Sequence, residues 1–275
     1  MSQTVTSARS QLTTIVGDRS LDVADLNIIQ LEGLVAKDPV ETAKLLQAAE
    51  SQGFFYVAFN DDLSAKIAGY LQTCYRNSHE FFSKPLDEKM KAFRDGVDNG
   101  YKKAGIESFE IPRDEQDSFA LPAPFAEDAA PTLDFLNICD TITRVVLRSL
   151  SDSLGPNEAS VIENAHRSDG HSESGLKFVS GPTKACIADV PDTTHTDGGS
   201  VTLLWCEKWA SQMQTKETKK WLWVDPKPDC VLVNVANYLQ TQSGARLHSP
   251  VHKVSQPVDG EEDRYFVSYF LRPNH

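Results

Sequence analysis

The chain has 275 residues, of which 40% are hydrophobic, and a formal net charge of −12 at pH 7. A chain of this length can bury one sizeable core, but its negative charge argues against a general nucleic-acid-binding protein, which needs a basic face. No apolar run approaches the roughly 20 residues of a membrane-spanning helix, so we expect a soluble protein that binds neither a membrane nor a nucleic acid.

The N-terminal region is polar and rich in Ser and Thr from Met1 to Arg19, and it lacks the apolar segment of a secretory signal. We therefore expect residues 1–20 to form a flexible leader. The cysteines show no paired or Cys-x-x-Cys spacing, which favours free thiols in a reducing compartment and a cytoplasmic protein. They are Cys74, Cys139, Cys186, Cys206 and Cys230.

The first half of the chain contains helical patterns. Apolar residues recur at a spacing of three to four in Val40–Gln52, Leu63–Phe82 and Leu133–Leu154, as amphipathic helices require. We interpret these helices as packing elements without a chemical role. The segment Asn99–Ala126 is rich in charge, Pro and Gly, and it predicts either a substrate-facing loop or a plain connector.

The second half of the chain favours short β-strands. Its segments are rich in β-branched and aromatic residues and are separated by turn-forming residues. Many short strands of this kind are typical of two packed antiparallel sheets. The predicted strands are Thr183–Val190, Val201–Trp205, Trp221–Val224, Cys230–Val235 and Tyr265–Leu271.

The sequence His195-Thr196-Asp197 is the most informative motif. Side chains alternate along an extended segment, so His195 and Asp197 would point into one cavity while Thr196 points away. Gly198 and Gly199 follow directly and predict a turn or a close backbone approach beside the site. Taken alone, a His-x-Asp motif is more often a simple hydrogen-bonded pair than a metal site.

A second histidine and a later arginine make the metal interpretation stronger. His252 lies in a short β-prone stretch, and Arg264 follows it. Two imidazoles and one carboxylate form the ligand set of a mononuclear non-haem Fe(II) site, which leaves positions open for oxygen and a co-substrate. Arg264 could bind a carboxylate through its planar fork, although an exposed salt bridge is the simpler alternative for an arginine.

Further segments complete a pattern that resembles a known family. The chain is similar to the isopenicillin N synthase-like branch of the Fe(II)/2-oxoglutarate oxygenases, most specifically in its His-x-Asp motif and distal histidine. The other matching segments are Leu21–Leu26, Gly53–Val57, the Phe81/Phe82-Pro85-Glu88-Lys89 pattern, Gly100-Tyr101, Trp221–Pro226 and Asn234-Val235.

This resemblance implies a mixed α/β fold with a mainly β core. The core would be a double-stranded β-helix, or jelly roll, with N-terminal and flanking helices. Residues 21–160 would form an N-terminal α/β region packed on a core at 161–275, in one compact unit. The resemblance also implies that His195, Asp197 and His252 bind Fe(II), that 2-oxoglutarate is the co-substrate and that O2 is consumed.

The chain departs from the family pattern near the expected co-substrate site. The resemblance implies that Arg264 binds the far carboxylate of 2-oxoglutarate, but Phe266 stands where the family has a serine. Ser268 shares the strand face of Arg264 by alternation, and we assign it to co-substrate binding as well. The family's tyrosines are also missing from Leu176–Pro182. These departures predict a remodelled substrate pocket formed by Phe266, Ser180 and Trp205.

The expected activity is oxidation of an unactivated C–H bond of a small organic substrate, plausibly in specialised metabolism. The reaction would be a hydroxylation, a desaturation or a ring formation, and the ligands do not distinguish these. One alternative is an Fe(II) oxidase of the isopenicillin N synthase type that does not use 2-oxoglutarate. Another is a catalytically inactive jelly-roll binding protein. The sequence leaves the substrate and the oligomeric state open.

Overall fold

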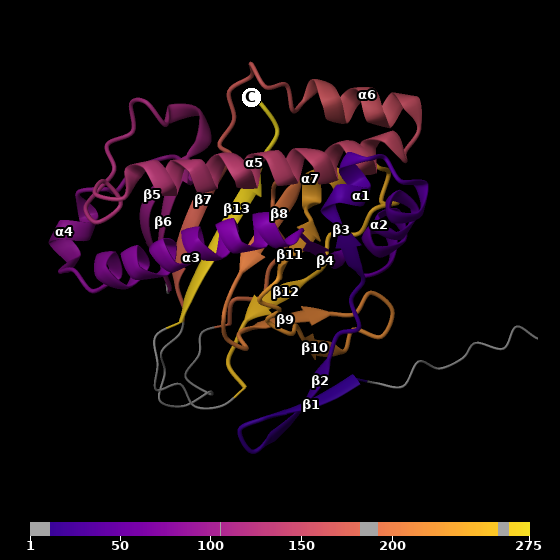
Figure 1. Ribbon diagram of the computed structural model, residues 1–275, viewed down its shortest axis with the longest axis horizontal. Coiled ribbons are helices and arrows are strands. Elements are labelled where there is room, and N and C mark those ends of the chain that lie inside the picture. The colour runs from indigo at the N-terminus through magenta and orange to yellow at the C-terminus, as the bar shows by residue number, and fades with distance from the viewer. Residues whose placement is uncertain (1–11, 105, 182–191, 258–263) are drawn as a thin grey trace, which may run out of the picture.

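The computed structural model describes residues 12–104, 106–181, 192–257 and 264–275 (Figure 1). Its strands form an eight-stranded and a five-stranded sheet. In spatial order, the large sheet contains β3 (Ile28–Gln30), β4 (Phe54–Ala58), β11 (Cys230–Val235), β8 (Val201–Trp205), β13 (Tyr265–Leu271), β7 (Gly175–Ser180), β6 (Ile106–Pro112) and β5 (Gly100–Ala104). The small sheet contains β1 (Leu12–Val16), β2 (Arg19–Val23), β10 (Trp221–Trp223), β9 (Ser211–Gln214) and β12 (His252–Val254).

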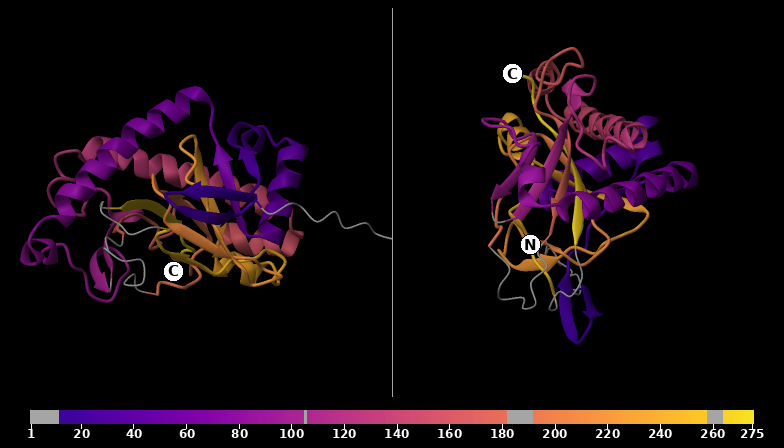
Figure 2. Two further views of the ribbon diagram at one scale, coloured as in Figure 1. Left: turned by 90° about the horizontal axis from the view of Figure 1, so that it is seen from below. Right: turned by 90° about the vertical axis from the view of Figure 1, so that its left-hand side faces the viewer.

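Helices cover one face of the large sheet (Figure 2). The two long helices, α3 (Asp61–Phe82) and α5 (Ala129–Asp152), pack on β7, β8 and β13 through buried side chains such as Phe81 and Phe135. Burying one such side chain contributes about 1.5–3 kcal/mol. The helices are α1 (Leu31–Val35), α2 (Pro39–Ser51), α3 (Asp61–Phe82), α4 (Leu86–Met90), α5 (Ala129–Asp152), α6 (Pro156–Asn164) and α7 (Asn237–Gln242).

The starts of two helices follow from their capping residues. The Asp38 side chain accepts a hydrogen bond from the Val40 backbone N–H, and Pro39 occupies the first helical position of α2. The Asn60 side chain caps α3 in the same way by accepting from Leu63. All three helices expected in the first half of the chain are present, with ends shifted by a few residues.

The opposite face of the large sheet faces the small sheet and contains the site. Along β13, Val267 and Tyr269 join the core beneath the helices, while Phe266, Ser268 and Phe270 line a cavity between the sheets. This alternation is the two-residue period of a strand. Two packed sheets with helices along one side form a double-stranded β-helix, as expected from the sequence.

The expected strands at 201–205, 230–235 and 265–271 are β8, β11 and β13, and the strand at 221–224 is β10. The strand expected at Thr183–Val190 lies outside the described residues. The large sheet takes β3 to β6 from the expected N-terminal region and its other strands from the expected core.

Residues 12–20 differ from the expected flexible leader. They belong to a hairpin of β1 and β2 that turns at Gly17, whose φ is +62°. Leu21 and Val23 anchor this hairpin by packing against Trp223. The β-branched residues and the Gly-Asp turn therefore outweigh the polar composition in this segment. Residues 1–11 lie outside the described part of the chain.

The segment 99–126 also differs from the loop or connector that its composition indicated. Its first half forms β5 and β6, which extend the large sheet because β6 pairs with β7 and β5 pairs with β6. In β6, buried Phe109 and Ile111 alternate with Ser108 and Glu110, which gives a strand period within a charged segment. Ser108 faces the cavity between the sheets, so part of this segment does contribute to the site.

Within the described ranges, no helix is long and apolar enough to cross a membrane.

Candidate metal centre

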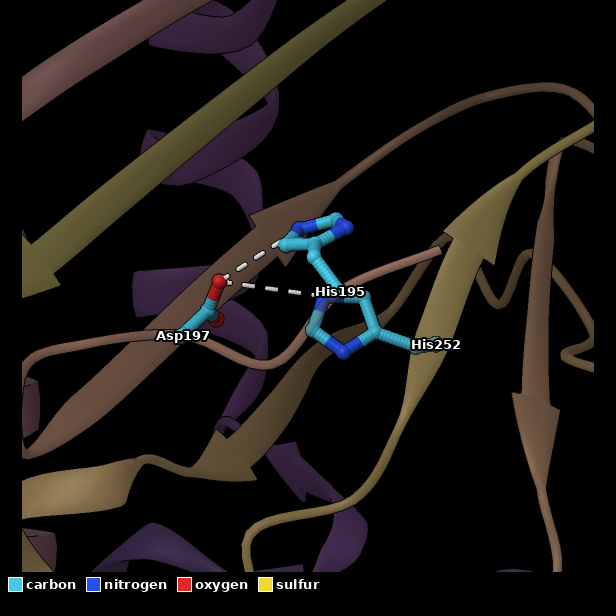
Figure 3. Close-up of side chains that lie close together, drawn as sticks. All are labelled: His195, Asp197 and His252. Carbon is cyan, nitrogen blue, oxygen red and sulfur yellow. Dashed lines mark ion pairs between the residues drawn. The ribbon is translucent and has the colours of Figure 1, made fainter. Parts of the chain in front are cut away.

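The side chains of His195 and Asp197, which are two residues apart, meet that of the distant His252 between the two sheets (Figure 3). One ligand atom from each of His195, Asp197 and His252 lies within 4.8 Å of the others. Asp197 Oδ1 is 3.6 Å from His195 Nε2 and 3.7 Å from His252 Nε2. These are the residues that the sequence motif singled out, and all three face one point.

Backbone pairing brings the two histidines together. His195 and His252 form an isolated antiparallel bridge in which each backbone N–H donates to the carbonyl of the other, both at 2.9 Å. The imidazole centroids are consequently 4.2 Å apart. The Phe54 ring meets His252 edge-on at 5.5 Å, which restricts the orientation of that imidazole.

Hydrogen bonds at Nδ1 define which ring nitrogen faces the site. His195 Nδ1 bonds the carbonyl of Thr193, and His252 Nδ1 bonds the carbonyl of Pro250 at 3.1 Å. A carbonyl can only accept, so each Nδ1 donates to it and each Nε2 is left to face the site. Metal-binding histidines have this arrangement of outer hydrogen bonds.

Asp197 is held by two neighbours that bind the same oxygen. Thr202 Oγ1 donates to Asp197 Oδ2 at 2.7 Å, and Asn234 Nδ2 donates to it at 2.8 Å. Oδ1 is therefore left to face the two histidines. Burial raises the pKa of Asp197, but His252, Asn234 and Thr202 lower it by more, so its pKa lies below the ordinary value and the carboxylate is ionised.

The donor set fits a divalent iron ion. Two neutral imidazole nitrogens and one carboxylate oxygen, grouped on one side, are the ligand pattern of non-haem Fe(II) oxygenases. The carboxylate is 7% exposed, and a bound cation would offset the cost of burying its charge. The His195 side chain is 47% exposed, so the group is open to the cavity on one side.

The described residues enclose a cavity of about 420 Å³ next to this group. Its walls are mostly apolar and include Val179, Phe266 and Phe270. The polar groups besides the histidines and Asp197 are Asp98, Lys102, Ser108, Lys177, Thr202, Ser211, Asn234, Lys253 and Ser268. A small organic molecule and a co-substrate could therefore lie beside the three ligand atoms.

The remaining predicted site residues lie in different environments. Phe266 and Ser268 line the cavity. Ser180 and Trp205 do not belong to its described lining, because they occupy the helix-facing positions of β7 and β8. Trp205 packs against Phe135 of α5, with ring centroids 5.1 Å apart. The structure therefore corrects the expectation that Ser180 and Trp205 form part of this pocket.

Arg264 is buried just before β13, and its guanidinium donates to the Gln256 side chain. It is not part of the described lining of the cavity. Its backbone carbonyl accepts a hydrogen bond from Gly181. A side chain at Gly181 would meet the Phe266 ring, because a Cβ there would lie 2.7 Å from Phe266 Cε2 and 3.0 Å from Arg264 Cβ. The Phe266 ring thus occupies space that the missing side chain at position 181 leaves open.

Sequence reasoning did not assign a role to Thr202, Asn234 or Lys177. Each is a polar residue at a cavity-facing position of a strand. The sequence did contain one signal for such residues, which is a polar residue within an otherwise apolar strand. Asn234 in Cys230–Val235 is an example.

Comparisons with known proteins match most of the chain. A family described as non-haem dioxygenase in morphine synthesis, N-terminal, matches residues 22–139, and the 2OG-Fe(II) oxygenase superfamily matches residues 177–273. The 2-oxoglutarate-dependent dioxygenase FG08081 of Gibberella zeae is 32% identical over 271 residues, covering 92% of this chain and 81% of its own. The 2-oxoglutarate-dependent dioxygenase frbH of Dothideomycetidae sp. is 33% identical, covering 92% and 83%.

Solved structures show the same fold at lower sequence identity. A full-length protein of Neurospora crassa, crystallised in complex with alpha-KG, superposes with a TM-score of 0.76 at 22% identity and covers 91% of this chain and 85% of its own. The Arabidopsis thaliana dioxygenase for auxin oxidation, in complex with 2-oxoglutarate, gives a TM-score of 0.73 at 17% identity, covering 91% and 93%.

Proposed function

Because this chain belongs to the 2OG-Fe(II) oxygenase superfamily, we propose that His195, Asp197 and His252 bind the iron ion of a 2-oxoglutarate-dependent dioxygenase. The observation that carries this assignment is the convergence of one ligand atom from each residue within 4.8 Å, with Asp197 Oδ1 3.6 and 3.7 Å from the two Nε2 atoms. Iron(II) bound there with 2-oxoglutarate and O2 supplies the oxidising power to attack an unactivated C–H bond, with succinate and carbon dioxide as co-products.

The residues of the chain hold and orient the reactants. The Nδ1 hydrogen bonds fix both imidazoles with Nε2 toward the cavity. Thr202 and Asn234 bind one oxygen of Asp197 and leave the other for the metal. The apolar walls, including Val179 and Phe270, exclude water from the reacting carbon and so limit side reactions.

Arg264 and Ser268 are our proposed co-substrate residues. Arg264 is a buried cation, and Ser268 is a hydroxyl within the cavity. A guanidinium can bind the far carboxylate of 2-oxoglutarate in a bidentate manner. Phe266 shapes the substrate pocket, because it lines the cavity and its ring lies against Gly181.

The substrate is a small organic molecule of a size set by the cavity of about 420 Å³. Relatives of similar sequence carry names of fungal 2-oxoglutarate-dependent dioxygenases, and further structures of the Neurospora crassa protein contain thymine or 5-formyluracil. We propose a reaction in specialised metabolism whose outcome is a hydroxylation, a desaturation or a ring formation.

Succinate formation tests the proposed function. The iron-loaded protein should release succinate from 2-oxoglutarate when it is offered a panel of amino acids, polyketides and terpenoids under O2, and the matching compound should be oxidised. The Asp197→Ala variant is the control and should release none. Substrate oxidation that continues without 2-oxoglutarate would instead indicate an oxidase of the isopenicillin N synthase type.

A further inference from the structure

A lysine projects into the metal-facing cavity from the large sheet. Lys177 lies on β7, directly opposite Ser268 on β13 and Glu110 on β6. It lines the same cavity as His195, Asp197 and His252, and its side chain is 24% exposed. A partly exposed ammonium in a mostly apolar cavity interacts strongly with an anion, because the local dielectric constant is low.

The interactions of Lys177 leave its ammonium donors available. Its Nζ is 3.6 Å from a carboxylate oxygen of Glu110, beyond hydrogen-bonding distance. Glu110 is fully buried and already accepts from both Nη atoms of Arg272, at 2.5 and 3.4 Å. Glu110 therefore receives its hydrogen bonds from Arg272 and forms only a longer ion pair with Lys177, and among the described residues no acceptor takes a hydrogen bond from Lys177 Nζ.

The other charged groups on the cavity wall are engaged elsewhere. Lys102 donates to the backbone carbonyl of Arg94, and Lys253 lies over the Trp221 ring at 4.2 Å. Asp98 is the remaining acid besides Asp197, but it is 65% exposed and pairs with an arginine outside the lining. Solvent therefore screens the charge of Asp98, and Asp98 does not neutralise the charge of Lys177.

The position of Lys177 suits one end of a molecule whose other end reaches the metal. Ser268 pairs with Lys177 on one side and with Leu204 of β8 on the other. The neighbouring cavity-facing residue of β8 is Thr202, which holds Asp197. Two strand spacings, roughly 10 Å, therefore separate Lys177 from the strand that supports the metal ligand. An acid with several carbons between its carboxylate and its reacting carbon matches this separation.

We propose that Lys177 binds the carboxylate of the organic substrate, so that this enzyme oxidises a small carboxylic acid. This inference rests on the proposed function, because it takes the metal to lie at His195, Asp197 and His252. The Phe270 ring, whose centroid is 5.5 Å from Lys177 Nζ, supports the lysine by a cation–π contact. The far carboxylate of 2-oxoglutarate is an anion that Lys177 could bind in the same way. The test must therefore distinguish a substrate carboxylate from the co-substrate carboxylate.

Binding of a matched acid and amide to the protein loaded with Mn(II) and 2-oxoglutarate tests this proposal. The probes are hexanoate with a terminal trifluoromethyl group and the corresponding amide. Their binding is measured by fluorine NMR. We expect the wild-type protein to bind the acid at least about tenfold more tightly than the amide, with Mn(II) broadening the fluorine signal. Lys177→Met should abolish this preference, and Lys177→Arg should retain most of it.

Lys103→Met is the matched control, because Lys103 lies on β5 outside the cavity lining and is half exposed. It should bind both probes as the wild type does. The proposal is overturned if the wild type binds both probes equally or binds neither. It is also overturned if Lys177→Met keeps an unchanged preference for the acid. A loss of 2-oxoglutarate affinity in Lys177→Met would assign the lysine to the co-substrate and overturn it too. A different result is expected if the proposed function is wrong and the metal does not bind at His195, Asp197 and His252. The protein would then still prefer the acid, but Mn(II) would not broaden its fluorine signal.

Discussion

The two hydrogen bonds to Asp197 Oδ2 predict how strongly the surroundings of the site control metal binding. Thr202→Val keeps the shape of the side chain but removes the donor at 2.7 Å, and Asn234→Leu removes the donor at 2.8 Å. A hydrogen bond to a charged group contributes about 1.5–3 kcal/mol. Because Asp197 is buried, water cannot readily replace the lost donor.

We expect each substitution to weaken Fe(II) binding by about 10–100-fold, the usual effect of removing a partner that orients a metal ligand. Both donors bind the same oxygen, so the double variant should deviate from the sum of the single effects. The measurement is an anaerobic Fe(II) titration of the wild type, the two single variants and the double variant, with circular dichroism to verify folding.

The matched control is Thr143→Val. Thr143 is also a buried threonine whose hydroxyl donates, here to the Cys139 carbonyl at 3.0 Å in α5, on the helix side of the large sheet. Its substitution should leave Fe(II) affinity unchanged. The reasoning that these bonds orient Asp197 would be refuted if folded Thr202→Val and Asn234→Leu bound Fe(II) as tightly as the wild type. It would also be refuted if Thr143→Val weakened Fe(II) binding equally.

Three further predictions concern the same region. Gly199→Ala should destabilise the fold by about 1–3 kcal/mol, because its Cβ would lie 2.7 Å from a backbone carbonyl oxygen, whereas Gly198→Ala has open space and should unfold in urea near the wild-type midpoint. Arg264→Ala should weaken 2-oxoglutarate binding by about 2–5 kcal/mol with Fe(II) binding retained, and an unaltered affinity in calorimetry would assign the carboxylate to another cation. Phe266→Ser should lower the yield of oxidised product per succinate; unchanged coupling with 2-oxoglutarate binding tighter by about 0.5–1.5 kcal/mol would reject a cavity-shaping role.

Alternation along one segment predicted that His195 and Asp197 share a side, and the resemblance to the oxygenase family added His252 as the third ligand. Sequence patterns could not predict the bonds from Thr202 and Asn234, since these depend on how β8 and β11 pair. The predicted close approach beside the motif is found at Gly199, which packs against the carbonyl of Leu271, and not at Gly198.

The misplacement of Trp205 and Ser180 has a common physical cause. The strands β7 and β8 are covered by helices on one face and face the small sheet on the other, so both faces hold buried residues. Hydrophobicity then cannot show which alternate set of side chains lines the cavity. Lys177 also points between the sheets, from a strand position to which the sequence analysis gave no role.

Anaerobic Fe(II) loading tests the central claim most directly. We predict one Fe(II) per wild-type chain, and loss of tight binding in both His195→Ala and His252→Ala, because each imidazole supplies one of the three donor atoms that lie together. His171→Ala, at a described histidine outside this group, should bind iron like the wild type. Full iron occupancy in either His195→Ala or His252→Ala would contradict the assignment of the metal centre.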